Sequence, residues 1–125
     1  MVQRTATQGK MFITLYSRKV HEFGQWQTRW TGFYISSEPQ CMEADRACDV
    51  RIYRQSHAFL EKNTSWVNVG ATVEHYAGEL RERVGFIEDG AREEVLRAID
   101  ECGLLPRQLE VAILNAARGA ISRVG

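Results

Sequence analysis

The stretch KMFITLYSRKVHEFGQWQTRWTGFYIS, residues 10–36, decides the fold of this 125-residue chain. In Lys10–Ser17 apolar side chains occupy every second position, which is the pattern of a half-buried β-strand. Gln25–Ser36 alternates in the same way over a longer distance, and Gly24 marks a turn before it. The pattern therefore predicts two antiparallel strands joined by a loop.

The two faces of the second predicted strand differ in chemistry. One face is mostly aromatic and consists of Trp26, Thr28, Trp30 and Tyr34. The other face begins with polar residues and ends with apolar ones; it consists of Arg29, Thr31, Phe33 and Ile35. If the second face fills the core, the Trp/Tyr face is partly exposed, and an exposed aromatic patch usually marks an interface. The alternative is that helices cover the Trp/Tyr face as the core, because the sequence does not fix the register between strands.

Later segments complete an α+β pattern. Asp49–Arg54 and Ser65–Gly70 are predicted as further strands, and the apolar spacing then becomes helical. Helices are predicted over Val73–Val84, from Asp89 to Gly103, and from Pro106 onward. We expect an α+β fold in one domain over residues 1–125, with residues 1–9 frayed. Its small antiparallel sheet has three to four strands, mostly in the N-terminal half, and packs against about three C-terminal helices.

Composition restricts the classes of function and the compartment. Sixteen Lys and Arg residues balance sixteen Asp and Glu residues, so the formal net charge is zero, which argues against a highly basic nucleic-acid-binding tail. No apolar run reaches the roughly 18 residues of a membrane span, and the N-terminus lacks the apolar stretch of a secretory signal. Three cysteines (Cys41, Cys48 and Cys102) cannot form a disulfide framework. We therefore expect a cytoplasmic protein in which Cys48 and Cys102 are small, buried core residues.

The sequence lacks the common motifs for metal, phosphate and serine-hydrolase sites. His21, His57 and His75 are far apart, and no CxxC, HxxxH or HExxH pattern occurs. No GxxxxGK[ST], GxGxxG or GxSxG pattern occurs either. We expect no metal and no cofactor, and no residue is assigned a catalytic role.

Aromatic and arginine side chains form the best candidate site in the sequence. Trp, Tyr and Arg are the residue types enriched at protein-binding hot spots. The predicted binding surface consists of Trp26, Arg29, Trp30, Tyr34, Arg51 and Tyr53. We expect a small non-catalytic domain that binds another protein, of the inhibitor, immunity or adaptor kind that phages and other mobile elements encode. The same surface, or the alanine-rich last helix, could join two copies as a homodimer.

Two other classes of function stay open. Three short motifs resemble, in order, those of ADP-ribosyltransferases: Ile13–Arg18 (ITLYSR), Gly32–Ser37 (GFYISS) and Gln108–Glu110 (QLE). The resemblance implies an NAD-dependent enzyme in which Arg18 helps to hold the dinucleotide, Ser36 supports the pocket and Glu110 assists transfer at the ribose. The other class is a nucleotide- or nucleic-acid-binding protein, because stacked aromatic rings with arginines also bind bases.

Overall fold

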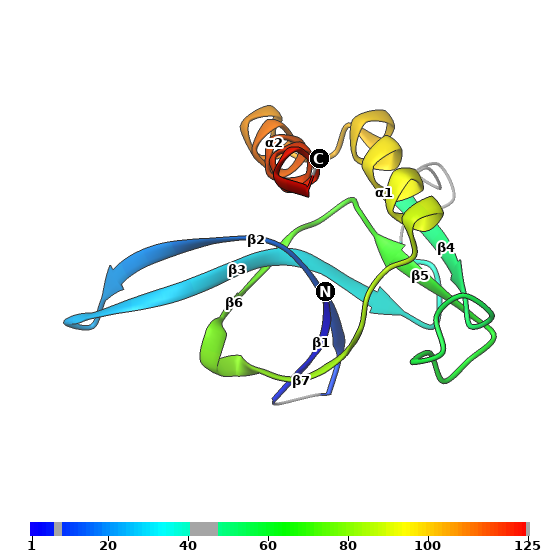
Figure 1. Ribbon diagram of the computed structural model, residues 1–125, viewed down its shortest axis with the longest axis horizontal. Helices are drawn as coiled ribbons and strands as arrows, with labels where there is room; N and C mark the ends of the chain where they lie inside the picture. The colour runs from blue at the N-terminus through cyan, green and yellow to red at the C-terminus, as the bar shows by residue number, and fades with distance from the viewer. Residues whose placement is uncertain (7–8, 41–47, 125) are drawn as a thin grey trace.

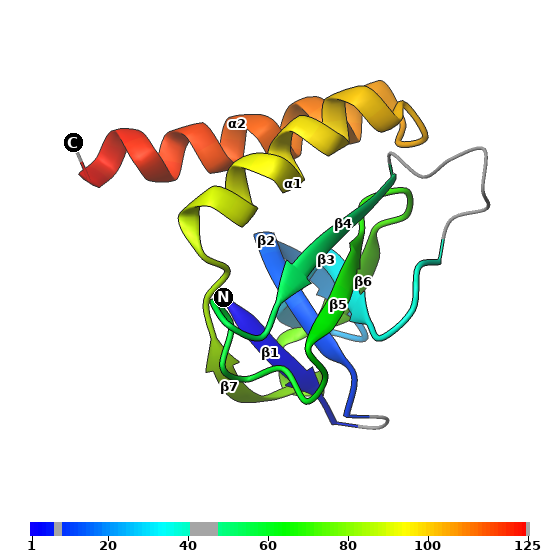
Figure 2. The same cartoon turned by 90° about the vertical axis from the view of Figure 1, so that its right-hand side faces the viewer.

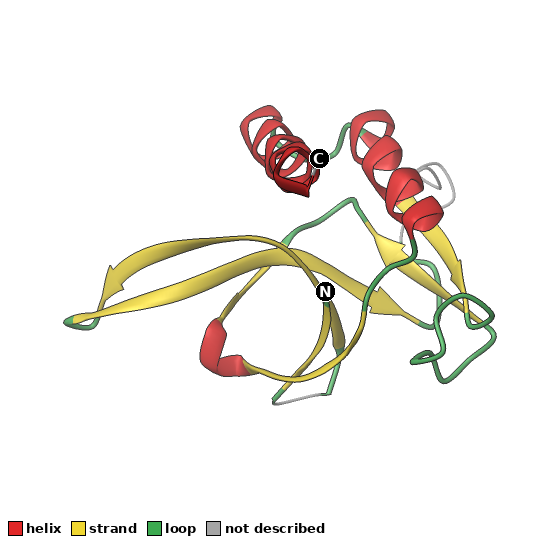
Figure 3. Cartoon of the chain, in the orientation of Figure 1, coloured by secondary structure: helices red, strands yellow, loops and turns green. Residues whose placement is uncertain are grey.

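The computed structural model describes residues 1–6, 9–40 and 48–124 (Figure 1). Its described elements are β1 (Val2–Thr5), β2 (Met11–Glu22), β3 (Gln25–Ser36), β4 (Asp49–Tyr53), β5 (Thr64–Asn68), β6 (Val73–Tyr76), the 3-10 helix η2 (Ala77–Glu79), β7 (Leu80–Gly85), α1 (Asp89–Cys102) and α2 (Arg107–Val124). The strands form one antiparallel sheet in the order β4-β5-β3-β2-β1-β7, and β6 pairs with β3 beside this path. Strands thus outnumber helices in the part of the chain described (Figure 3).

The predicted antiparallel pair of strands is confirmed as the long hairpin of β2 and β3. The two strands pair from Met11↔Ile35 to Glu22↔Gln25, with one irregularity between Thr14 and Tyr16. Phe23 and Gly24 close the hairpin, both with a positive φ (53° and 75°), as tight hairpin turns require. The far half of this hairpin extends away from the helices (Figure 1).

The prediction of a three- to four-stranded sheet with three helices was wrong. The segment predicted as the helix Val73–Val84 forms β6, η2 and β7, which lead from the middle of β3 round to β1 (Figure 1). Val73, Tyr76, Leu80 and Val84 repeat at helical spacing, but β-branched and aromatic residues also suit strands. Pairing with distant strands overrides that local spacing. β1, which begins in the segment expected to be frayed, pairs with both β2 and β7.

Helices α1 and α2 cover one face of the sheet (Figure 2). The core beneath them contains apolar side chains from both layers, among them Ile13, Phe33, Ile35, Val50, Ile52, Val67, Val95, Ile99 and Ile113. Phe33 and Ile35 therefore face the helices, as the first of the two sequence interpretations required. Neither of the two described helices is long and apolar enough to cross a membrane.

The structure joins Cys48 to Cys102 by a disulfide, with 5.1 Å between the Cα atoms. Cys48 immediately precedes β4, and Cys102 is the last residue of α1, so the bond ties the helical layer to an edge of the sheet. The expectation that the cysteines form no disulfide was wrong for this pair, whereas Cys48 is buried in the core and Cys102 packs against it. Cys41, the third cysteine, lies outside the described residues.

Glu88 caps the N-terminus of α1. Its carboxylate accepts hydrogen bonds from the N–H groups of Gly90 (2.9 Å) and Ala91 (3.2 Å). These bonds, and to a lesser extent the nearby His57, hold the pKa of Glu88 below its ordinary value. A carboxylate at this position also complements the helix dipole.

Glu88→Gln is expected to lower the melting temperature at neutral pH. A depressed native pKa stabilises the fold above the unfolded value of about 4.3, and this contribution is lost as the pH falls through the native pKa. The melting curves of wild type and variant should therefore differ at pH 7 and converge in acid. Glu94→Gln is the matched control, because Glu94 is exposed in the middle of α1 and has no hydrogen bond or ion pair among the described residues. A difference that persisted unchanged at pH 2 would contradict this account.

Candidate functional site

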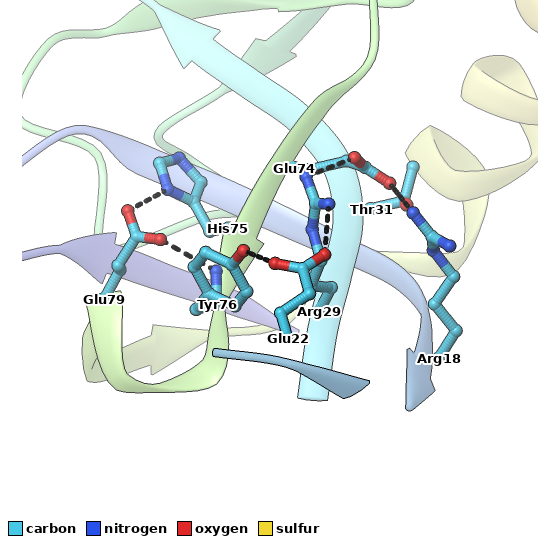
Figure 4. Close-up of polar contacts among 8 residues, drawn as sticks. All are labelled: Arg18, Glu22, Arg29, Thr31, Glu74, His75, Tyr76 and Glu79. Carbon is cyan, nitrogen blue, oxygen red and sulfur yellow. Dashed lines mark hydrogen bonds and ion pairs between the residues drawn. The ribbon is translucent and has the colours of Figure 1, made fainter. Parts of the chain in front are cut away.

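A polar cluster lies on the far half of the β2–β3 hairpin and on the neighbouring β6 (Figure 4). It is on the same face of β3 as the core residues, but farther along the hairpin from the helices. We call it the Arg29 cluster; it consists of Arg18, Glu22, Arg29, Thr31, Glu74 and Tyr76. Arg29 lies on the same face of β3 as the core residues Phe33 and Ile35, because side chains at every second position of a strand share a face. Glu74 and Tyr76 occupy the facing positions on β6, where Tyr76 pairs directly with Arg29.

Arg29 is at the centre of the cluster. Its Nη2 lies 2.6 Å from Oε2 of Glu74, and its Nη1 lies 3.5 Å from Oε1 of Glu22. Its guanidinium lies over the ring of Tyr76, 5.2 Å from the centroid. The side chain is 25% exposed, and its buried Nε has no hydrogen-bond partner among the described residues. The guanidinium is thus held in place by two carboxylates and a ring, while solvent still reaches part of it.

The carboxylates of the cluster have further polar partners. Glu74 also accepts hydrogen bonds from Arg18 (3.3 Å) and from the hydroxyl of Thr31 (3.4 Å). Glu22 accepts a short hydrogen bond from the phenol of Tyr76. That bond is the main reason why the pKa of Tyr76 is raised, so this phenol keeps its proton at neutral pH. The cluster therefore joins a carboxylate acceptor, Glu22, to a protonated donor, Tyr76, beside a fixed cation.

A second cluster lies on the opposite face of β6. The ring of His75 contacts Tyr34 through Nε2 (2.7 Å) and Glu79 through Nδ1 (3.1 Å), and packs edge-on against the buried Phe12. The pKa of Glu79 is lowered mainly by the hydrogen bond from the backbone N–H of Tyr76 and next by the hydrogen bond with the ring of His75. Burial raises the pKa of Tyr34. Both ring nitrogens of His75 have hydrogen-bond partners, so we interpret this cluster as a polar network that stabilises the fold.

Aromatic and cationic side chains project from the end of the hairpin. Phe23 is 88% exposed and Trp26 is 72% exposed, and the ring of His21 packs edge-on against Trp26. The hairpin strands carry three cations (Arg18, Lys19 and Arg29) and one carboxylate (Glu22). The two strands of the hairpin are therefore cationic by themselves, and Glu74 of β6, which pairs with Arg18 and Arg29, offsets part of this charge.

The structure distributes the six predicted site residues over three places. Trp26, Trp30 and Tyr34 share one face of β3, and Arg29 lies on the opposite face. Arg51 and Tyr53 are exposed on β4, which β5 separates from β3, and Arg51 lies over the ring of Trp66. Sequence reasoning found Arg29 but missed Glu22, which the β2–β3 hairpin places beside it. It also missed Glu74 and Tyr76, which join Arg29 because β6 pairs with β3.

The residues that resemble ADP-ribosyltransferase motifs have separate partners. Arg18 pairs with Glu74, whereas Glu110 is buried in α2 and pairs with Arg107 (2.9 Å). Ser36 ends β3 opposite Trp66. No group of three or more His, Cys, Asp or Glu side chains in the described part of the chain could hold a metal ion.

Comparison with known proteins gives a likeness of fold. No family model and no curated protein sequence matches the chain. Among solved structures, the toxin MazF-mt6 of Mycobacterium tuberculosis superposes with a TM-score of 0.60 at 15% sequence identity, covering 84% of this chain and 97% of that one. A structure described as an Mtb toxin gives a TM-score of 0.59 at 16% identity, covering 82% of this chain and 99% of that one.

These two structures overturn the prediction of a non-catalytic inhibitor, immunity or adaptor protein. Both matched chains are toxins, and each is covered almost from end to end. The prediction failed because it took Trp, Tyr and Arg as the mark of a protein-binding surface, although the same residue types bind nucleic acid. The chain has the fold of these toxins.

Proposed function

We propose that this chain is a toxin that cleaves RNA, with the Arg29 cluster as its reaction site. The observation that carries the proposal is the likeness of fold to two toxins over nearly their whole length. The Arg29 cluster supports it, because a fixed guanidinium beside a carboxylate and a protonated phenol suits acid–base chemistry at a phosphate.

The cluster supplies each part of a cleavage by the ribose 2′-hydroxyl. The carboxylate of Glu22 takes the proton of the 2′-hydroxyl, whose oxygen attacks the adjacent phosphorus. The bond from phosphorus to the 5′-oxygen breaks, and that oxygen takes the proton of Tyr76. Arg29 stabilises the charge that develops on the phosphate oxygens. The products are a 2′,3′-cyclic phosphate and a 5′-hydroxyl, and the hydrogen bond between Tyr76 and Glu22 returns the proton.

The surroundings of the cluster favour a single-stranded substrate. Phe23, which directly follows Glu22 of the cluster, offers an exposed ring on which an unpaired base can stack, at about 1–3 kcal/mol per base. Lys19 is exposed on β2 and adds a positive charge that complements the phosphate backbone. DNA lacks the 2′-hydroxyl, so the proposed reaction leaves DNA intact.

Arg29→Ala is expected to slow RNA cleavage by roughly 100-fold or more, because a fixed donor to the developing charge is lost. The assay uses a pool of 5′-labelled single-stranded RNA oligonucleotides, with gel separation and detection of cyclic-phosphate ends. Arg29→Lys keeps the charge but loses the planar contacts, so it should restore only part of the rate. Arg54→Ala, at an exposed arginine just after β4, is the matched control and should cleave like wild type.

Three results would separate the parts of this proposal. Wild-type protein that cleaves no RNA in the pool, and does not arrest growth when expressed, rejects the function. Cleavage that continues unchanged in a folded Arg29→Ala variant rejects the site but not the function. Cleavage of an RNA with a deoxynucleotide at the cut position rejects the mechanism.

The cytoplasm, where RNA is plentiful, is the compartment that this proposal requires. We also propose a homodimer. Its contact surface would include two exposed apolar side chains, Leu104 in the turn between α1 and α2 and Val111 in α2. The molar mass in solution, measured by light scattering, decides between monomer and dimer.

A further inference from the structure

We propose that a cavity beneath the helices binds a small amphipathic carboxylate with an unbranched alkyl tail. The cavity has a volume of about 510 Å³ and lies between β2, the segment that joins β7 to α1, and the inner sides of α1 and α2. This volume is within the range of roughly 300–1,000 Å³ that is usual for small-molecule sites. The proposal concerns a site separate from the Arg29 cluster and does not depend on RNA cleavage.

The walls of the cavity are mostly apolar. Ile13 and Leu15 of β2 line one side, and Val95, Leu96 and Ile113 of the helices line another. Ala116 and Ala117 also line it, and their short side chains leave space where α2 passes over β2. An alkyl chain in this space would remove apolar wall surface from water, at about 25 cal/mol per Å².

Among the described residues that line the cavity, Arg92 has the one cationic side chain, and the N-terminal amino group of Met1 lies near enough for Arg92 to help lower its pKa after burial. The guanidinium of Arg92, which is only partly exposed, donates one hydrogen bond, to the carbonyl of Ala117 at 3.3 Å. It has no ion pair with any described residue, although the exposed Asp89 also lines the cavity. A guanidinium has five N–H donors, so most of those of Arg92 remain available. A carboxylate would accept two of them in the bidentate geometry that guanidinium prefers.

The cavity is also lined by an exposed aromatic side chain, that of Phe86. Phe86 is 69% exposed. It follows Gly85, where an added Cβ atom would lie 2.7 Å from Cδ1 of the Phe59 ring. An alkyl carboxylate whose head group reaches Arg92 would place part of its tail against Phe86.

The test measures binding of decanoate by calorimetry, with 1-decanol as the uncharged probe of equal length. We expect saturable binding of one decanoate per chain and a shift of the methyl resonances of Ala116 and Ala117. Arg92→Met should weaken decanoate binding at least 10-fold and leave 1-decanol binding unchanged. Ala116→Leu, which fills the cavity, should abolish the binding of both.

Two variants control for changes of charge and size. Arg97→Met removes an exposed arginine from the outer side of the same helix, and Ala112→Leu enlarges an exposed alanine of α2. Both should bind decanoate like wild type. Equal affinity of wild type and Arg92→Met for decanoate, or binding that does not saturate, would overturn the proposal. So would a dimer that Ala116→Leu converts to monomer, because a second copy would then occupy this space.

Discussion

Gly32→Ala is expected to prevent folding. Gly32 lies in the middle of β3, where it pairs with Thr14 of β2 on one side and with Val73 of β6 on the other. A Cβ atom at this position would overlap the carbonyl oxygen of Ile13 and would lie 2.6 Å from Cζ of the buried Phe12. The first obstacle is backbone and cannot move without breaking the pairing of β2 with β3. We expect a loss of more than about 4 kcal/mol in the free energy of unfolding, which is the range of severe core defects.

The matched control for this substitution is Gly78→Ala. Gly78 lies in η2, and a Cβ atom there would have nothing within 4 Å. It should give soluble protein with a melting temperature close to that of wild type. Circular dichroism and thermal melts of the two variants make the comparison. A Gly32→Ala protein that melts like wild type would show that β2 and β3 are not joined as described.

Loss of the Cys48–Cys102 disulfide is expected to destabilise the fold by about 4 kcal/mol. The bond joins residues 54 positions apart, and closing a loop of this length restricts the unfolded chain by about that amount in the chain-entropy model. For a protein of this size, the melting temperature should fall by roughly 10–20 °C. Treatment with dithiothreitol and the double substitution Cys48→Ala with Cys102→Ala should both produce the shift.

The double variant provides its own control. Dithiothreitol should lower the melting temperature of wild type and leave that of the double variant unchanged. Thiol titration of the unfolded wild type should find one free thiol before reduction and three after it, because the sequence contains three cysteines. Three free thiols before reduction would contradict the disulfide.

Local patterns predicted the parts of the fold whose partners lie close in sequence. Alternation and Gly24 predicted the β2–β3 hairpin, and Asp89, Gly103 and Pro106 marked the ends of the last two helices correctly. The segment of β6 and β7 was predicted as a helix, because its apolar residues recur at intervals of three and four. Which strands it would pair with depends on contacts some 40 to 80 residues away, and these leave no local pattern.

The candidate site was predicted incompletely for the same reason. Arg29 was predicted as a site residue because of its aromatic neighbours, but Glu74 lies in the segment that the sequence predicts as the helix Val73–Val84. Once β6 pairs with β3, Glu74 lies opposite Thr31 and its carboxylate reaches Arg29. Net charge misled as well: sixteen acidic residues balance sixteen basic residues over the whole chain, but one acidic and three basic residues lie in the strands of the hairpin.

The position of β6 in the chain has a consequence for synthesis on the ribosome. Glu74 is 45 residues after Arg29, and Tyr76 is 54 residues after Glu22. The hairpin can form as soon as it leaves the exit tunnel, but its partners emerge several seconds later at 5–20 residues per second, taken as a rough range. β1 waits longer still for β7. A nascent chain therefore carries an unassembled Arg29 cluster until well over half of the protein has been translated.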